Sequence, residues 1–228
     1  MTVPTYDIGC VPKNSLTTVI FSAGNIIPEN ALAGCETLKS VTMPHGITEI
    51  KSGAFEGCSS LTSIALPFSV ESIGEKAFYE SGLTKIYLYD AVTSVGANAF
   101  GNCAALGEVR ISSYIGEGLN VTAFSGCDNI TTAELPTYAL EANVISLKNV
   151  VDLTINNYAL DENDVGVSLN VSFLAGADNL KNLTIGRGVT AISDLAGLNA
   201  EGIALKVDDN NPVFEVINNK IVLRNNEA

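Results

Sequence analysis

Four of the five cysteines in this 228-residue chain recur at one place of a repeated pattern. They follow Leu32, Phe55, Phe100 and Phe124 by three places, and they are Cys35, Cys58, Cys103 and Cys127, while Ser81 takes the same place after Phe78. Metal-binding thiolates need clustered ligands at short spacings such as Cys-x-x-Cys, and the chain contains none. A disulfide between Cys35 and Cys58 is an alternative, but a column of small buried thiols accounts better for the spacing. We therefore predict that these four thiols are free and shielded, and that Cys10, which stands outside the column, is exposed.

The single histidine is poorly placed for catalysis. A Ser-His-Asp or Cys-His arrangement needs the base to be packed beside its nucleophile. His45 instead occupies the turn Pro44-His45-Gly46, so we interpret it as a solvated turn residue. Neither a Gly-x-x-x-x-Gly-Lys motif nor a Gly-x-Gly-x-x-Gly motif after a strand occurs, so no phosphate-binding loop is indicated.

Carboxylates are plentiful, and a pair of them could in principle hydrolyse a glycoside. They fall mostly at turns, for example at Asp161, Glu162 and Asp164. The run at residues 208–211, Asp-Asp-Asn-Asn, suggests calcium, but it lacks graded ligand spacing, and a turn before Pro212 is the better interpretation. We therefore predict no catalytic residue, no cofactor and no metal site, and we expect the chain not to be an enzyme.

Composition restricts the class of partner. The chain carries a net charge of −13, with 46% hydrophobic and 16% charged residues. Nucleic acids and anionic membrane surfaces are bound by clustered Lys and Arg, so we expect neither partner here. No run of 18 apolar residues is present, so this segment should not insert into a membrane, and its first ten residues lack a signal-peptide pattern.

The periodicity of the cysteines belongs to a longer repeat of apolar residues. Its units begin 22, 23, 22 and 23 residues apart, at Leu16, Leu38, Leu61, Leu83 and Leu106. Further units open at Ile130, Val150 and Leu180, 20 and 30 residues apart, which indicates one short coil and then an insertion around residues 156–166. Another unit begins near Gly202. A phase kept this long predicts a solenoid of about eight to nine stacked coils.

The coil that begins at Leu61 shows how one unit is built. Ile64 and Leu66 alternate with the smaller Ser63 and Ala65 and predict a strand in which Ile64 and Leu66 face inward. Pro67 lacks an N–H and limits that strand, while residues 70–73 suit a second short strand and residues 75–79 one helical turn. We expect a mainly β fold with little helix: a parallel β-sheet on one face, and short strands or helical turns on the other.

A start such as LTSIALP at residues 61–67, joined to Ala-Phe-x-x-Cys as at residues 54–58, resembles the BspA-like, or Treponema-type, leucine-rich repeats. The resemblance is specific over residues 16–127 and looser to Val207, and residues 136–180 lack a clean Ala-Phe-x-x-Cys. Residues 207–223, VDDNNPVFEVINNKIVL, are similar to the family's recurrent turn and hairpin. The resemblance implies a bacterial or protist protein at the cell surface or outside the cell that adheres to host proteins, glycans or other cells.

We predict three segments. Residues 1–15 cover the first coil, and residues 16–207 form the leucine-rich-repeat solenoid, regular over 16–129 and irregular over 130–179. Residues 208–228 form a turn and a C-terminal β-hairpin with Asn218-Asn219 at its tip. The hairpin either caps the solenoid, which we favour, or precedes further repeats in a longer protein.

Outward positions of the first strands are mostly small or polar, except in the middle of the stack. The exceptions, which we predict to contact a partner, are Lys85, Tyr87, Tyr89, Glu108, Arg110 and Glu134. Tyr and Arg are enriched at binding hot spots. Cross-strand packing of Tyr87 against Arg110 explains the same residues without a ligand.

Two functions follow from this pattern. The leading one is a non-catalytic binding module that presents a sheet face to a protein or glycan. The alternative is a structural spacer in a larger surface protein, with no ligand of its own.

Overall fold

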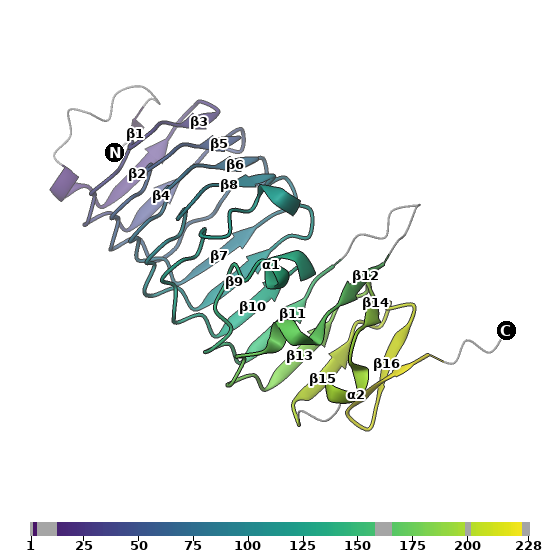
Figure 1. Cartoon of the computed structure of the whole chain (residues 1–228). Helices are drawn as coiled ribbons and strands as arrows, with labels where there is room; N and C mark the ends of the chain where they lie inside the picture. The colour runs from purple at the N-terminus through teal and green to yellow at the C-terminus, as the bar shows by residue number, and fades with distance from the viewer. Residues whose placement is uncertain (1, 4–12, 158–165, 199–201, 225–228) are drawn as a thin grey trace. The chain divides into compact units, whose positions relative to one another are not determined.

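The structure, a computed structural model, describes residues 2–3, 13–157, 166–198 and 202–224 (Figure 1). The chain divides into two compact units, Met1–Asn129 and Ile130–Ala228. Each is built from short parallel strands stacked coil on coil, and the fold is a β-solenoid, with about eight turns along the chain and little helix. The predicted leucine-rich-repeat solenoid is therefore confirmed. Cys10 and the acidic residues at positions 161–164 lie outside the described residues.

In the first unit, each side of the coil carries its own parallel strands. The leading side contains β1 (Thr2–Val3), β2 (Thr18–Phe21) and β4 (Ser40–Thr42) in one ladder, and β7 (Lys85–Leu88) paired with β9 (Glu108–Ile111). The returning side is a ladder of β3 (Ile26–Ile27), β5 (Glu49–Ile50), β6 (Ser72–Ile73) and β8 (Ser94–Val95). Two 3-10 turns complete the unit, η1 (Lys13–Ser15) and η2 (Gly116–Gly118).

The coil that begins at Leu61 departs from the prediction, because residues 61–67 form no strand. Leu66 is buried as expected, but Ile64 is only half-buried. The N–H and the hydroxyl of Thr84 both donate to the carbonyl of Thr62, at 3.0 and 3.1 Å. These bonds join residues 62 and 84, but they do not continue into a parallel ladder over residues 61–67. The pairs β2–β4 and β7–β9 are therefore separate ladders within the unit.

The Ala-Phe turns also differ from the prediction. Residues 75–79 do not form a helical turn, because Lys76 and Glu80 adopt φ of 55° and 56°, in the left-handed region. Their N–H groups instead donate to the next coil, as Phe78 does to the carbonyl of Ala99 at 2.7 Å and Phe55 to that of Ala77 at 2.7 Å. The turns therefore add backbone pairing between coils, which satisfies groups that a helix would have paired internally.

Identical residues at identical places stack in the core of the first unit. The rings of Phe55, Phe78, Phe100 and Phe124 lie parallel, with neighbouring centroids 5.0, 5.2 and 5.0 Å apart and planes within 10°. This distance is close to the spacing of about 4.8 Å between strands, so each coil sets its ring directly on the ring before it. The first three of these rings are fully buried.

The second unit keeps one long ladder and adds irregular pieces around it. The ladder is β10 (Thr132–Leu135), β11 (Asp152–Ile155), β13 (Asn182–Ile185) and β15 (Ala204–Val207). Around it lie β12 (Val167–Leu169) paired with β14 (Val189–Ile192), α1 (Thr137–Glu141), η3 (Val171–Leu174) and α2 (Leu195–Leu198). Asp152 pairs with Asn182, 30 residues later, so the insertion leaves the strand register intact.

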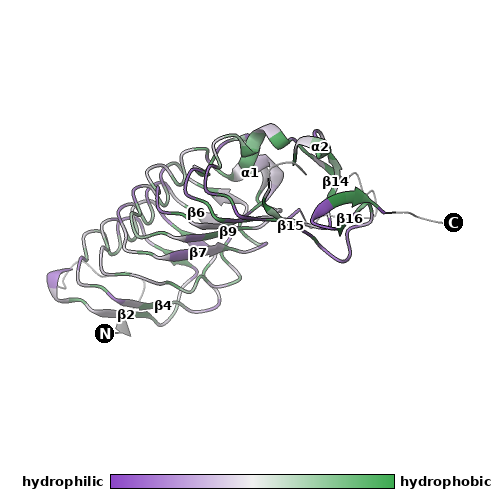
Figure 2. Cartoon of the chain, turned by 90° about the horizontal axis from the view of Figure 1, so that it is seen from below, coloured by the Kyte–Doolittle hydropathy of each residue, from purple (hydrophilic) through white to green (hydrophobic). Residues whose placement is uncertain are grey.

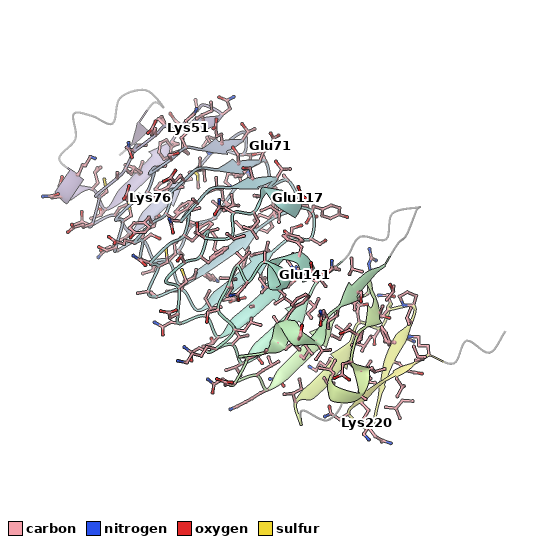
Figure 3. All side chains as sticks on the ribbon, viewed as in Figure 1. Lys51, Glu71, Lys76, Glu117, Glu141 and Lys220 are labelled. Carbon is pink, nitrogen blue, oxygen red and sulfur yellow. The ribbon has the colours of Figure 1, made fainter. Side chains whose placement is uncertain are left out.

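An antiparallel hairpin follows the last strand of this ladder, formed by β16 (Phe214–Ile217) and β17 (Lys220–Leu223). Lys220, the first residue of β17, is labelled in Figure 3. Asn218 and Asn219 have φ of 52° and 56°, as the predicted two-residue turn requires. The run at residues 208–211 is a turn in which the N–H of Asn210 donates to the carboxylate of Asp208 at 2.8 Å.

Candidate functional site

Strands β7 and β9 position most of the predicted binding residues on one face. Their parallel register sets Lys85 opposite Glu108, and Tyr87 opposite Arg110. Ile86 and Val109 are buried in the core. The residues that alternate with them along each strand therefore face outward. The alternation of hydrophilic and hydrophobic residues along these strands can be followed in Figure 2.

Tyr87, Glu108 and Arg110 form a connected cluster on this face. The hydroxyl of Tyr87 donates to Oε1 of Glu108 at 3.0 Å, and Nε of Arg110 donates to the same oxygen at 3.1 Å. The Arg110 guanidinium also lies over the Tyr87 ring, 4.8 Å from its centroid, and makes an ion pair with Glu108 at 3.0 Å. Burial and the hydrogen bond to Glu108 raise the pKa of Tyr87. The phenol therefore stays protonated, and the cluster is a preformed arrangement of one ring, one anion and one cation.

Lys85 and Tyr89 extend the cluster in two directions. The Lys85 ammonium lies 5.8 Å from the centroid of the Tyr87 ring, on the same strand. Tyr89 contacts Phe68 of the preceding coil, with ring centroids 4.5 Å apart and planes tilted by 50°. The Phe68 side chain is 73% exposed, the largest exposure among the large hydrophobic residues that the structure describes as exposed. An aromatic pair at the edge of the sheet thus adjoins the polar cluster.

Phe68 is the site residue that the sequence analysis missed. It occupies the turn place after Pro67, where the preceding coil has His45 and the following coil has Asp90. A large apolar residue in a column of polar turn residues was the available signal. Comparing the turn columns, as well as the strand columns, would have found it.

Glu134 lies in the second unit and is described there. It stands on β10, opposite Thr154 of β11, and its Oε1 accepts a hydrogen bond from the Asn156 amide at 3.4 Å. The structure therefore groups five of the six predicted residues within the first unit, namely Lys85, Tyr87, Tyr89, Glu108 and Arg110.

The cysteine column is a packing feature. All four of its thiols are free and buried, as predicted. Cys127 donates to the carbonyl of Phe100 at 3.0 Å, Cys103 to that of Phe78 at 3.1 Å and Cys58 to that of Leu32 at 3.3 Å, so these three thiols reach back to the coil before them. Burial raises the pKa of Cys58 to about 12. A thiol that stays protonated is a poor nucleophile, so this residue is suited to stacking and not to chemistry.

His45, the other residue considered for chemistry, lies in a turn. His45 is exposed, and its carbonyl accepts a hydrogen bond from the Ser69 hydroxyl. Among the described residues, no group of three or more His, Cys, Asp or Glu side chains could hold a metal ion. Over the same residues, no helix is long and apolar enough to cross a membrane.

The second unit contains a hollow of about 580 Å³ next to η3. Its polar lining includes Asn170, Ser193 and Asp194. Asn170 caps η3 by accepting from the N–H of Ser172 at 3.1 Å, and Asp194 accepts from the N–H of Gly197 at 2.8 Å. These side chains organise the local backbone, which explains their presence without a ligand.

A family model described as BspA type leucine rich repeat region matches residues 25–154 in six copies. The chain belongs to this family. The resemblance seen in the Leu-x-x-Ile-x-Leu-Pro and Ala-Phe-x-x-Cys motifs is therefore confirmed. Phe68, Tyr87, Arg110 and Glu134 all lie within the matched region, so each candidate stands on a BspA-type repeat.

Three solved structures are similar to this BspA-type chain. A leucine-rich repeat protein from Bacteroides ovatus is 18% identical, with a TM-score of 0.49, over 86% of this chain and 64% of that one. The leucine rich repeat protein of T. pallidum is 23% identical, with a TM-score of 0.46, over 85% and 73%. A leucine rich cell surface protein from Faecalibacterium prausnitzii is 22% identical, with a TM-score of 0.30, over 86% and 60%. The chain thus spans less than two thirds of the first and third of these proteins, and no curated protein matches it.

Proposed function

We propose that this chain is a non-catalytic binding module at the cell surface or outside the cell. Its site is the outward face of β7 and β9 together with the aromatic pair Phe68–Tyr89. The partner is a protein or a glycan on a host or neighbouring cell. Leucine-rich repeat proteins in general bind proteins and are generally non-catalytic, and the cell-surface assignment rests on membership of the BspA-type family.

The exposed Phe68 ring carries the proposal. An exposed phenylalanine leaves apolar area in water, which is unfavourable unless a partner covers it. Beside it, Tyr89 packs on Phe68, and Arg110 and Glu108 place a positive and a negative charge close to the aromatic pair. Tyr and Arg are among the residue types enriched at binding hot spots. The cluster is preformed, so a partner would not have to order these side chains on binding.

A structural spacer is the competing function, and one observation favours it. Tyr87, Glu108 and Arg110 bond to one another, as the cross-strand alternative required. That network needs no ligand. It does not account for Phe68, whose ring lies outside it.

The test uses a printed glycan array and a panel of immobilised extracellular-matrix glycoproteins as probes. We expect binding by the intact chain, and a loss of affinity of at least about tenfold in a Phe68→Ala/Tyr89→Ala variant and in a Tyr87→Ala/Arg110→Ala variant. Val121→Ala is the matched control, because Val121 is also an exposed apolar residue, 57% exposed, but lies in an Ala-Phe turn. Undiminished binding by both double variants would place the site elsewhere. The absence of binding on both panels would favour the spacer.

A further inference from the structure

Two exposed aromatic residues stand along one edge of the first unit. Phe68 lies in the two-residue turn at positions 68–69, and Tyr114 lies in the corresponding turn two coils later, at positions 113–114. They are 73% and 58% exposed. Of the residues that the structure describes in this unit, two others are large, hydrophobic and exposed, namely Ile20 on β2 and Val121 in an Ala-Phe turn. The exposed apolar area at this edge is therefore small and aromatic.

Asp90 lies in the turn between these two aromatic residues. It is exposed, and it takes the same place in its coil as Phe68 does in the coil before. Its Oδ1 accepts a hydrogen bond from the Ser112 hydroxyl at 2.6 Å, and the oxygen of that hydroxyl accepts one from the N–H of Tyr114 at 3.2 Å. In the part of the chain that the structure describes, no donor bonds to its Oδ2. The edge thus carries a ring, then a carboxylate with an open acceptor oxygen, then a second ring.

This order of groups is complementary to a sugar. A pyranose has a face of C–H groups and a rim of hydroxyls. The negative face of an aromatic ring attracts C–H groups that carry partial positive charge, and a carboxylate is a strong acceptor for a hydroxyl. Neighbouring coils lie about 4.8 Å apart, so the turns of Phe68 and Tyr114 are about 10 Å apart. A short oligosaccharide can therefore contact both rings and the carboxylate between them.

Size and charge narrow the class of partner. Stable protein interfaces bury roughly 800 Å² of each partner around an apolar core, whereas two separate rings with Asp90 between them offer no such core. The chain has a net charge of −13, and Asp90 stands at the centre of the edge, so sialylated or sulfated sugars are repelled. A neutral sugar fits both the size and the charge.

We propose that the turn edge formed by Phe68, Asp90 and Tyr114 binds a neutral oligosaccharide. The sugar packs on the two rings and donates a hydroxyl to Asp90. Tyr89 supports Phe68 from the neighbouring coil, with ring centroids 4.5 Å apart. The inference rests on the proposed binding function, names its class of ligand and adds Asp90 and Tyr114 to its site.

Titration of the full chain and its variants on a printed array of neutral, sialylated and sulfated glycans tests the inference. Phe68→Leu and Tyr114→Leu keep an apolar side chain but remove a ring, and each should weaken binding to neutral glycans about fivefold. Because both residues are exposed, the variants should fold. Val121→Leu is the matched control, since it changes an exposed apolar residue away from this edge and should bind as the wild type does.

Asp90→Asn separates recognition of the sugar from a purely structural role. The amide keeps an acceptor oxygen for Ser112 but loses the negative charge. Binding to neutral glycans should weaken about threefold, and discrimination against sialylated glycans should decrease. A loss of local structure would weaken binding to both kinds of glycan alike.

Three results would overturn the inference and leave the proposed function in place. The first is binding only to matrix glycoproteins, undiminished after enzymatic removal of their glycans. The second is a preference for sialylated or sulfated glycans over neutral ones. The third is binding to neutral glycans that none of the variants at Phe68, Asp90 and Tyr114 weakens. Absence of binding to both the array and the glycoproteins would contradict the proposed function as well.

Discussion

The two units of this chain solve the same stacking problem with different groups. In the first unit, columns of Phe and Cys repeat from coil to coil, and the turns pair through their backbone. In the second unit, the coils vary in length and buried asparagines take over part of the pairing. Among the described residues, the buried polar or charged side chains are Ser81 in the first unit, and Thr137, Asn156, Asn157 and Asn211 in the second.

The difference follows from the regularity of the repeat. Coils of equal length set each backbone donor opposite an acceptor, so side chains can be apolar. When a coil is shortened or interrupted, some backbone groups lose their counterparts, and a buried unpaired group is costly. An asparagine side chain supplies a donor and an acceptor at such a place, as the oxygen of Asn157 does for the N–H of Thr137 at 2.9 Å. Regular repeats are thus stabilised by stacking, and irregular ones by specific hydrogen bonds.

The largest expected effect comes from breaking the phenylalanine column. Phe78 is fully buried between Phe55 and Phe100. Phe78→Ala should lower the free energy of unfolding of the first unit by about 3–5 kcal/mol, because it leaves a cavity that rigid neighbours cannot fill. Urea denaturation, monitored through amide exchange within residues 13–129, measures this change in the free energy of unfolding. Phe68→Ala, at an exposed position, should change the same quantity by less than about 0.5 kcal/mol, and equal losses would contradict the column's role.

Replacing Asn211 tests whether asparagine side chains stabilise the second unit by bonding to its backbone. Asn211→Ala removes the partners of two carbonyls and two N–H groups and should cost about 2–3 kcal/mol, since three of these bonds are buried and the fourth is partly buried. Amide exchange at Val213 and Phe214 is the most direct measurement. Asn210→Ala is the control, because Asn210 is an exposed residue of the same turn. Should both variants exchange alike, the hairpin is held by other contacts.

Alkaline pH should weaken the first unit through its cysteine column. The Cys58 pKa rises from its ordinary value of 9.0 to about 12 in the fold, mainly because of burial. The folded state therefore holds the proton more tightly than the unfolded state. The resulting stabilisation is complete below about pH 9 and is lost as the pH rises toward 12, with about 1.4 kcal/mol lost by pH 10.

The difference in urea stability between the wild type and Cys58→Ser, followed from pH 7 to pH 10, isolates this contribution. Serine already occupies the equivalent place in the column at Ser81, so the variant should fold. A difference that does not change with pH would show that Cys58 titrates normally.

The smallest effect should come from the outward face of the first unit. Tyr87→Phe removes the hydroxyl that bonds to Glu108 but keeps the ring under Arg110, so stability should fall by less than about 1 kcal/mol. Ile86→Val, on the buried side of the same strand, should cost about 0.5–1.5 kcal/mol. Thermal denaturation of both variants compares the two faces. A larger loss for Tyr87→Phe would mean that the face serves folding more than binding.

Much of the fold could be predicted because the repeat encodes it. The spacing from Leu16 to Leu106 predicted the coils, and the Asn218-Asn219 pair predicted the hairpin turn. The predictions of a strand at residues 61–67 and of a helical turn at residues 75–79 were wrong. In the turn, backbone N–H groups donate to the next coil and do not bond within a helix. In the candidate site, strand alternation indicated Tyr87 and Arg110. Their sharing of Glu108, and the packing of Phe68 on Tyr89, depend on side-chain positions that alternation does not specify.

The sequence by itself determined which residues face inward and that coils must stack. A period of about 23 residues with fixed apolar places leaves one coil unable to bury its core alone. The tertiary structure decided which groups meet across coils: the Phe rings at 5.0–5.2 Å, the thiol of Cys127 on the carbonyl of Phe100, and the Asn219 amide on the edge of β15. Such contacts join residues far apart along the chain. Their partners are set by the register of stacking, which exists only once the coils have folded against one another.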